Sequence, residues 1–241
     1  MKTLKFQAVV LLFLAIWGNT FSQAKQEEKH FSKLESRTVS FGYLLYLPPG
    51  YEDDGNTEFP LMLFLHGSGE RGTDLELVKK NGPPKVAEEM DLPFIILSPQ
   101  CPEVVWWDVD DVKVLLDEII ADYPVDKDRI YITGLSMGGF ATWDMIVKYP
   151  DVFAAAIPVC GVGYPFRLEV IKDLPIWAFH GQKDNVVPIE YSERMVDALK
   201  KINGNVQFTI YPEAGHDSWT ETYNNPEVYQ WLRKQKKSNN K

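Results

Sequence analysis

The sequence predicts an α/β fold in which helices cover both faces of a mostly parallel central sheet. Short apolar runs alternate along the chain with segments in which apolar residues recur at helical spacing. The runs are nearly continuous in apolar residues, which is typical of strands that are buried on both faces. This alternation favours a parallel sheet with its ligand sites outside the carboxyl ends of the strands.

The elements are expected in a regular order along the chain. Strands are predicted at residues 39–47, 60–65, 94–98, 129–133, 154–159, 175–179 and 206–211. Helices are predicted at residues 109–120, from 137 to Pro150, at 189–199 ahead of Gly204, and at 226–234. The longest irregular stretches are residues 66–77, 98–107, 161–173 and 212–225. None of them is long enough for a large cap domain, so we expect an open cleft edged by loops.

The first 24 residues have the pattern of a secretory signal peptide. Lys2 and Lys5 precede an apolar run at residues 8–16, and small residues suited to cleavage follow at 22–24. The apolar run is about half of the roughly 20 residues needed to span a bilayer, so we expect no stable membrane insertion after cleavage. We therefore predict a secreted or periplasmic protein with a signal peptide at 1–24 and a single domain at 25–241.

Composition limits the partners and cofactors. The chain carries a formal net charge of −9, which repels nucleic-acid phosphates, and the lysines of its tail at 234–241 are typical of a solvated end. We therefore expect no nucleic-acid partner. The four histidines are scattered and the two cysteines form no Cys-x-x-Cys pair, so no metal or other cofactor is expected.

The pairing of the two cysteines, Cys101 and Cys160, stays open because an exported protein can form disulfides. The two residues follow expected strands that lie three spacings apart, roughly 14 Å, whereas a disulfide needs Cα atoms within about 7 Å. The spacing argues against a bond, although converging loops would permit one.

The segment Gly134-Leu-Ser136-Met-Gly138 follows an expected strand directly and leads into an expected helix. The glycines leave room for a strained turn that Cβ atoms would block. A serine at such a corner is a candidate nucleophile. The Gly-x-Ser-x-Gly pattern is only moderately specific by itself, and the apolar strand before it strengthens the interpretation.

A serine hydroxyl needs a base to take its proton, and a carboxylate to hold that base. Two histidines follow Ser136 in the sequence. His216 comes just after the expected strand at 206–211, where a loop can bring its imidazole over the nucleophile, so we predict it as the base. His180 ends a strand directly before Gly181, so we interpret it as a packed structural residue.

We predict Asp184 as the acid, because it lies in a loop between a strand and a helix and fits the order serine, acid, histidine of α/β hydrolases. The alternative is that Asp184 caps the following helix. Pro188 marks a later helix start, which leaves Asp184 free in the loop. Asp217 is the second candidate for the acid, but it is poorly placed to reach the imidazole of its own neighbour, His216.

Acyl transfer also needs backbone amides directed at a developing oxyanion. The amide of Met137 is one candidate, and we assign the other to Ser68 in the glycine-rich loop at 66–72. This loop lacks the lysine and serine that end a P-loop, so phosphate binding is not expected. The side chains expected to brace the loop are those of His66, Glu70 and Arg71.

Several motifs together resemble one family. They are His66-Gly67-x-Gly69-Glu70-Arg71-Gly72, Pro99-Gln100-Cys101-Pro102 with Trp106-Trp107, Gly134-x-Ser136-x-Gly138, Pro158-x-Cys160-Gly161, the loop of Asp184, and Gly215-His216. The chain resembles secreted α/β-hydrolase esterases of the phospholipase/carboxylesterase and dienelactone-hydrolase-like group, whose relatives include predicted peptidases and feruloyl or acetyl esterases. The resemblance implies ester hydrolysis through an acyl-enzyme. Ser136 stands where true dienelactone hydrolases carry cysteine, which argues against their particular substrate.

Five aromatic side chains fall in segments expected to edge the cleft. They are Trp106, Trp107, Tyr164, Phe166 and Trp219, of which Trp107, Tyr164 and Trp219 are the cleft candidates. We expect about three of the five to pack at the bases of loops. Aromatic faces stack on phenolic acids and sugar rings, which suits an exported enzyme that removes feruloyl or acetyl groups from polysaccharides. The alternatives are a lysophospholipase or longer-chain acyl esterase, a peptidase, and a non-catalytic binding protein on the same fold.

Overall fold

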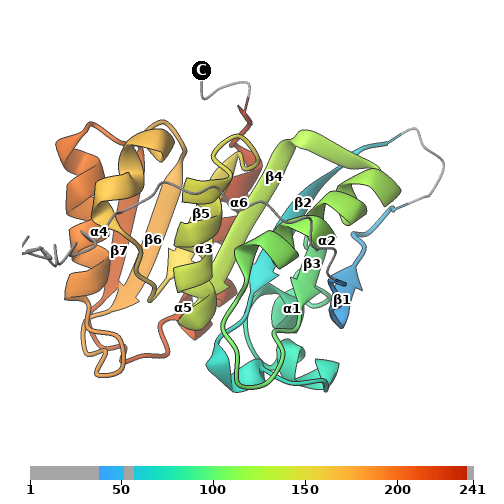
Figure 1. The fold of residues 1–241 in the computed structure, drawn as a ribbon, viewed down its shortest axis with the longest axis horizontal. Coiled ribbons are helices and arrows are strands. Elements are labelled where there is room, and N and C mark those ends of the chain that lie inside the picture. The colour runs from blue at the N-terminus through green and yellow to red at the C-terminus, as the bar shows by residue number, and fades with distance from the viewer. Residues whose placement is uncertain (1–37, 52–56, 238–241) are drawn as a thin grey trace, which may run out of the picture. The chain divides into compact units, whose positions relative to one another are not determined.

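The computed structural model describes residues 38–51 and 57–237 (Figure 1). These residues belong to one compact unit, Thr38–Lys241. The predicted signal peptide at 1–24 and the first part of the predicted domain, at 25–37, lie outside the described residues.

The described strands form one seven-stranded sheet in the order β1-β3-β2-β4-β5-β6-β7. They are β1 Tyr43–Tyr46, β2 Phe59–Leu65, β3 Ile95–Pro99, β4 Val125–Leu135, β5 Ala155–Val159, β6 Ile176–Gly181 and β7 Val206–Tyr211. Strand β1 pairs antiparallel with β3, and the other neighbouring strands pair in parallel. The prediction of an α/β fold with a mostly parallel central sheet is therefore confirmed.

Helices pack on both faces of the sheet, as predicted. They are α1 Pro83–Val86, α2 Val109–Asp122, α3 Met137–Lys148, α4 Glu190–Lys201, α5 Trp219–Asn224 and α6 Pro226–Arg233. Leu63 of β2 belongs to the hydrophobic cluster formed with α2, α3 and α4, which lie in front of the sheet in Figure 1. Its neighbours Met62 and Phe64 belong to the cluster formed with α1, α5 and α6. Successive side chains of a strand point to opposite faces, so the two clusters lie on the two sides of the sheet.

The bounds of two strands differ from the prediction. Strand β1 covers only residues 43–46 of the expected 39–47, and β4 begins at Val125 rather than at 129. The start of β4 includes the exposed residues Lys127 and Asp128. Its side chains there face solvent, so this part of the strand carries no apolar run that could reveal it.

Short helices fill the stretches that were expected to be irregular. They are η1 Ser68–Glu70, η2 Leu75–Lys80, η3 Pro165–Ile171 and α5. Segments of one or two turns contain too few residues to show a helical period, which is why the sequence did not predict them. The described connections at the carboxyl ends of the strands carry these short elements and loops, which agrees with the prediction of no large cap.

Leu63→Ala should lower the free energy of unfolding by about 2–5 kcal/mol, because Leu63 is fully buried in β2 and its truncation leaves a cavity. Equilibrium unfolding in urea measures the change. Val114→Ala on α2 is the matched control: Val114 is 52% exposed, and its truncation should change the free energy by less than about 0.5 kcal/mol. Equal losses in the two variants would contradict the assignment of the core.

Candidate active site

Ser136 occupies the corner between β4, which ends at Leu135, and α3, which begins at Met137. Its backbone has φ 50° and ψ −117°, a conformation that residues other than glycine rarely adopt. A Cβ atom on Gly138 would overlap the carbonyl group of Leu65, so only glycine permits this close approach. The strained turn expected from the sequence is present, and strain of this kind is concentrated at functional sites.

Hydrogen bonds join the predicted serine, histidine and aspartate in one line. Ser136 Oγ lies 3.0 Å from His216 Nε2, and His216 Nδ1 lies 2.8 Å from Asp184 Oδ2. An ionised carboxylate only accepts hydrogen bonds, so His216 Nδ1 carries the proton and Nε2 is left to accept from the serine hydroxyl. This geometry permits proton transfer from the hydroxyl to the imidazole.

Asp184 is buried and held from two sides. Its Oδ1 accepts hydrogen bonds of 2.9 Å from the amides of Val186 and Val187, while its Oδ2 faces His216. Burial alone would raise the pKa of the carboxyl group, but the hydrogen bonds from His216 and the two amides outweigh it and lower the pKa of Asp184. Asp184 is therefore an anion at neutral pH.

Asp217, the second candidate for the acid, has other partners. Its Oδ1 accepts a 3.0 Å hydrogen bond from the amide of Thr220, and its Oδ2 a 2.9 Å bond from the Thr220 hydroxyl. Both bonds lie at the start of α5, so Asp217 stabilises that helix end. The carboxylate that contacts the imidazole of His216 is that of Asp184.

The structure also brings His180 to Asp184. The ring of His180 is fully buried, and its Nε2 lies 3.1 Å from Asp184 Oδ2. Interpreting His180 as a packed residue was correct for its burial but missed this contact. The contact depends on the directions of the two side chains at the end of β6, which the spacing of the residues does not reveal.

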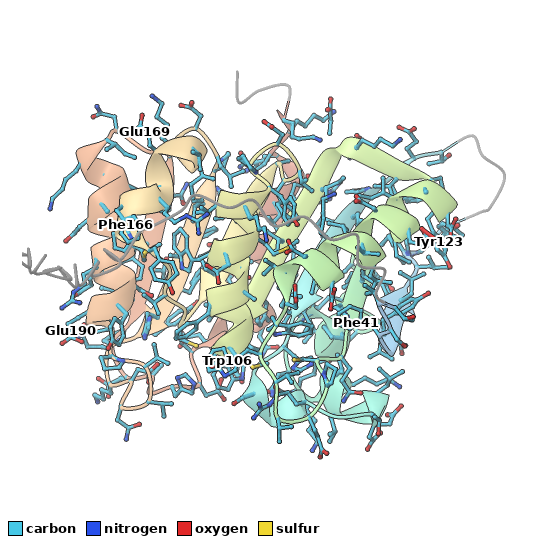
Figure 2. The ribbon with its side chains drawn as sticks, in the orientation of Figure 1. Phe41, Trp106, Tyr123, Phe166, Glu169 and Glu190 are labelled. Atoms are coloured by element: carbon cyan, nitrogen blue, oxygen red, sulfur yellow. The ribbon has the colours of Figure 1, made fainter. Side chains whose placement is uncertain are left out.

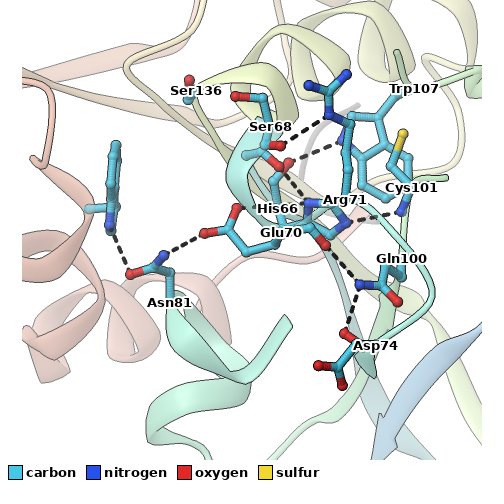
Figure 3. A network of polar contacts seen from close by, with 12 residues as sticks. His66, Ser68, Glu70, Arg71, Asp74, Asn81, Gln100, Cys101, Trp107 and Ser136 are labelled. Atoms are coloured by element: carbon cyan, nitrogen blue, oxygen red, sulfur yellow. Dashed lines mark hydrogen bonds and ion pairs between the residues drawn. The ribbon is translucent and has the colours of Figure 1, made fainter. Parts of the chain in front are cut away.

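His66 braces the glycine-rich loop, as predicted (Figure 3). Its Nε2 accepts a 2.9 Å hydrogen bond from the amide of Cys101, and its Nδ1 donates to the carbonyl of Gly67 at 2.6 Å. Burial lowers the pKa of His66 to about 4, so the ring is neutral with its proton on Nδ1. The backbone engages both nitrogens, and neither is left for a substrate.

The direction of the Ser68 amide follows from this contact. In a trans peptide unit the C=O and N–H groups point in opposite directions. Because the carbonyl of Gly67 is turned toward His66, the N–H of Ser68 is turned away from it. Arg71 fixes the next peptide unit by donating from Nε to Ser68 O at 3.0 Å and from Nη1 to Val105 O at 3.1 Å. The loop is therefore held in place by its own contacts before any substrate binds.

A second chain of contacts links this loop to His216. Glu70 Oε1 accepts a 2.5 Å hydrogen bond from Asn81 Nδ2, and Asn81 Oδ1 accepts a 3.2 Å bond from Trp219 Nε1. Figure 3 shows the side chain of Asn81 directed toward Glu70. The ring of Trp219 meets the ring of His216 edge to face, with centroids 5.2 Å apart. The contact restrains rotation of the imidazole. No pattern in the sequence indicates the role of Asn81.

Trp107 and Trp219, two of the three predicted cleft residues, are half-buried and hydrogen-bonded. Trp107 Nε1 donates to the carbonyl of His66 at 3.1 Å, and the Trp107 ring packs on the His66 ring. Both indole groups therefore support the loops of the site, and their contact with a substrate stays a prediction.

The other three of the five predicted aromatic side chains are exposed. Trp106, Tyr164 and Phe166 are 64%, 56% and 82% exposed. Trp106 packs edge to face on Phe140 in the first turn of α3, the end of that helix nearest Ser136. Figure 2 shows Phe166 well separated from Trp106. Tyr164 and Phe166 contact each other after β5. Two of the five aromatic residues are packed, rather than the expected three.

Cys101 and Cys160 are both buried, free thiols, in agreement with the argument against a disulfide. Burial raises the pKa of the Cys160 thiol to about 12, so it is neutral. Its sulfur and the ligand atoms of Asp184 and His216 lie within 4.8 Å of one another, a grouping that could surround a metal ion. Metal binding would require a thiolate and a deprotonated ring nitrogen, so the hydrogen-bonded state of the group suits proton transfer better.

The fold and the site together define an α/β hydrolase with a serine at its strand-to-helix elbow. The model of the dienelactone hydrolase family matches residues 2–239, and the chain belongs to that family. The family resemblance seen in the motifs is therefore confirmed.

Three known proteins illustrate the likeness. The crystal structure of a thermostable esterase superposes with a TM-score of 0.72 at 37% identity, over 81% of this chain and 59% of that one. The carboxylesterase SOBER1 of Arabidopsis thaliana is 28% identical over 134 residues, which is 52% of this chain and 58% of that protein. The chain thus spans less than two thirds of either relative. A ferulic acid esterase shares the fold with a TM-score of 0.61 at 18% identity, over 79% of this chain and 89% of that one.

Asp184→Asn should lower the free energy of unfolding at pH 7 by about 1–3 kcal/mol, because it removes charge-assisted hydrogen bonds. The pKa of Asp184 is lowered in the folded state, so this stabilisation is present above the unfolded-state value of about 3.9 and is lost as the pH falls through the folded-state value. Urea unfolding of both proteins at pH 7 and at pH 3 measures the difference. A difference that persists undiminished at pH 3 would contradict the ionised assignment.

Proposed function

We propose that the protein hydrolyses carboxylic esters through an acyl-enzyme formed on Ser136. The observation that carries the proposal is the line of hydrogen bonds from Ser136 through His216 to Asp184. Membership of a hydrolase family and the likeness to esterases support it. The reaction requires only water, and we propose no cofactor.

In the first half-reaction, Ser136 Oγ attacks the carbonyl carbon of the ester while its proton passes to His216 Nε2. The bond to the alcohol then breaks, and His216 returns the proton to the departing oxygen. In the second half-reaction, water gives a proton to His216 and attacks the acyl carbon, which releases the acid and restores the serine hydroxyl. Asp184 remains ionised throughout and stabilises the imidazolium.

We assign the oxyanion hole to the backbone amides of Met137 and Ser68. Met137 is the first residue of α3, and the first amides of a helix have no partner within the helix. The amide of Ser68 is turned away from His66, in a loop that is held by His66 and Arg71. Donors that are fixed before the reaction stabilise the developing charge without a reorganisation penalty.

For the substrate we propose esters of aromatic or acetyl groups carried on polysaccharides. The exposed Trp106 beside the first turn of α3 supports this class, because its face is free to stack on a phenolic ring. The short connections around the site leave room for a bulky, polymer-borne ester.

We also propose that the protein is exported. The basic and apolar pattern of residues 1–24 supports export. Within the described ranges, no helix has the length and apolar character required to cross a bilayer.

Ser136→Ala should reduce kcat on p-nitrophenyl acetate by at least about 1,000-fold, because it removes the attacking oxygen. Asp184→Asn should also reduce kcat strongly. Asp217→Asn is the matched control, since Asp217 contacts Thr220 instead of the imidazole, and it should keep near-parental activity. The proposal fails if Ser136→Ala retains activity within tenfold of the parent, or if Asp217 matters more than Asp184.

Trp106→Ala should raise KM for a feruloyl ester by about three- to tenfold, because a stacking partner is lost. KM for the matching acetyl ester should stay unchanged and serves as the control. Initial rates on acetyl, feruloyl and dodecanoyl esters of one sugar alcohol measure both effects. Activity that peaks on the dodecanoyl ester would favour a longer-chain acyl esterase instead.

A further inference from the structure

His180 contacts the same carboxylate oxygen as His216. It lies in β6, close to its carboxyl end, and its ring has no exposed surface. Its Nε2 is 3.1 Å from Asp184 Oδ2 and 2.8 Å from the carbonyl oxygen of Val187. Asp184 Oδ2 also accepts from His216 Nδ1, so one carboxylate oxygen lies between two imidazole rings.

The partners of His180 determine where its proton lies. Both groups that face Nε2, a carboxylate and a carbonyl, only accept hydrogen bonds, so Nε2 carries a proton. Nδ1 lies 2.7 Å from Ser192 Oγ, which is itself 3.0 Å from the carbonyl of Gly161. Burial lowers the pKa of His180 and keeps the ring neutral, so Nδ1 carries no proton, and the single hydrogen of the Ser192 hydroxyl is shared between Nδ1 and the carbonyl of Gly161. The two acceptors at Nε2 therefore fix the tautomer that turns an N–H toward Asp184, and Ser192 on α4 supports it through its contact with Nδ1.

His180 also holds the loop that carries Asp184. Its Nε2 bonds to the carbonyl of Val187, whose amide donates back to Asp184 Oδ1 at 2.9 Å. The ring thus closes the loop over residues 184–187 onto β6. Both oxygens of the Asp184 carboxylate are therefore held in place. The loop amides bond to Oδ1, and the two histidine rings contact Oδ2.

We infer that His180 is a positioning residue for Asp184. Its Nε2–H group aligns the carboxylate with His216 and partly neutralises the negative charge on Oδ2. This inference rests on the proposed roles of Ser136, His216 and Asp184. An N–H directed at Oδ2 reduces the negative charge that His216 experiences. Removing that N–H should strengthen the attraction of Asp184 for the protonated form of His216. It should also make the orientation of the carboxylate less well defined.

Other groups near the pair do not supply this N–H. Cys160, directly after β5, has a neutral thiol, and the hydroxyl of Ser136 at the elbow contacts His216 at Nε2, the nitrogen that does not face Asp184. Asp217, beside His216, bonds to Thr220 and adds negative charge rather than a donor. Besides His216 itself, His180 is therefore the titratable group that supplies a donor to Asp184 Oδ2.

The test compares His180→Leu, which removes the donor, with His180→Gln, whose side-chain amide can place an N–H near the position of Nε2. For His180→Leu we expect kcat to fall about tenfold. The acid limb of kcat/KM should move to higher pH by about half a unit. His180→Gln should restore most of both. The NMR titration midpoint of the His216 ring, one of four histidines in the chain, should move in the same direction and requires no turnover.

Two further variants keep the test decisive. Ser192→Ala should move the acid limb in the same direction by a smaller amount, and it replaces His180→Leu if that variant does not fold. Tyr131→Phe is the matched control for Ser192→Ala. It likewise loses one hydroxyl hydrogen bond, the 2.9 Å bond to the carbonyl of Gln235, which lies outside the site. It should lower stability slightly and leave the pH profile unchanged.

A pure packing role would be shown by a lower melting temperature in His180→Leu with an unchanged acid limb and an unchanged His216 midpoint. Equal behaviour of His180→Gln and His180→Leu would also overturn the inference, because the donor would then be irrelevant. Activity of Ser136→Ala would instead refute the proposed function, and the NMR midpoint would still decide the role of His180.

Discussion

The close approach of the first turn of α3 to the end of β2 is the contact on which the site depends. No side chain fits between Gly138 and the carbonyl of Leu65, and a Cβ atom on Gly134 would in turn overlap the carbonyl of Gly138. This contact sets Ser136 at a strained corner and places the glycine-rich loop, which continues directly from β2, beside it. The nucleophile and the proposed oxyanion donors are therefore brought together by backbone packing rather than by their own side chains.

The remaining groups arrive through the direction of the strands. Ser136 follows β4, Asp184 follows β6, and His216 follows β7, and these strands run parallel in one sheet. Their carboxyl ends lie at one edge, so residues far apart in sequence come within hydrogen-bonding distance. The same rule brings Cys101, after β3, to the backbone of the glycine-rich loop through His66. The parallel order of the strands thus brings the residues of the site together, and the loops adjust the positions of their side chains.

Much of this arrangement could be predicted from the sequence, because it depends on patterns that the chain displays. Buried strands are continuous apolar runs, and the positions of Ser136, Asp184 and His216 follow from where those runs end. The start of β4 escaped prediction because its exposed residues carry no apolar signal, and α5 because it is too short to be periodic. The contacts of His180, Asn81 and Trp219 escaped because they depend on side-chain directions across separate loops, which spacing along the chain does not reveal.

The histidine proposed as the base is attached to a less protected part of the sheet than the serine. It follows β7, which is the edge strand of the described sheet and has several half-buried or exposed residues, whereas Ser136 follows β4, which lies at the centre. Edge strands open locally at lower free energy than central strands. Fraying of this single strand would separate the proposed base from the nucleophile while the core stays folded. We therefore expect the edge of the sheet at β7, rather than its interior, to limit the proposed activity as the temperature rises.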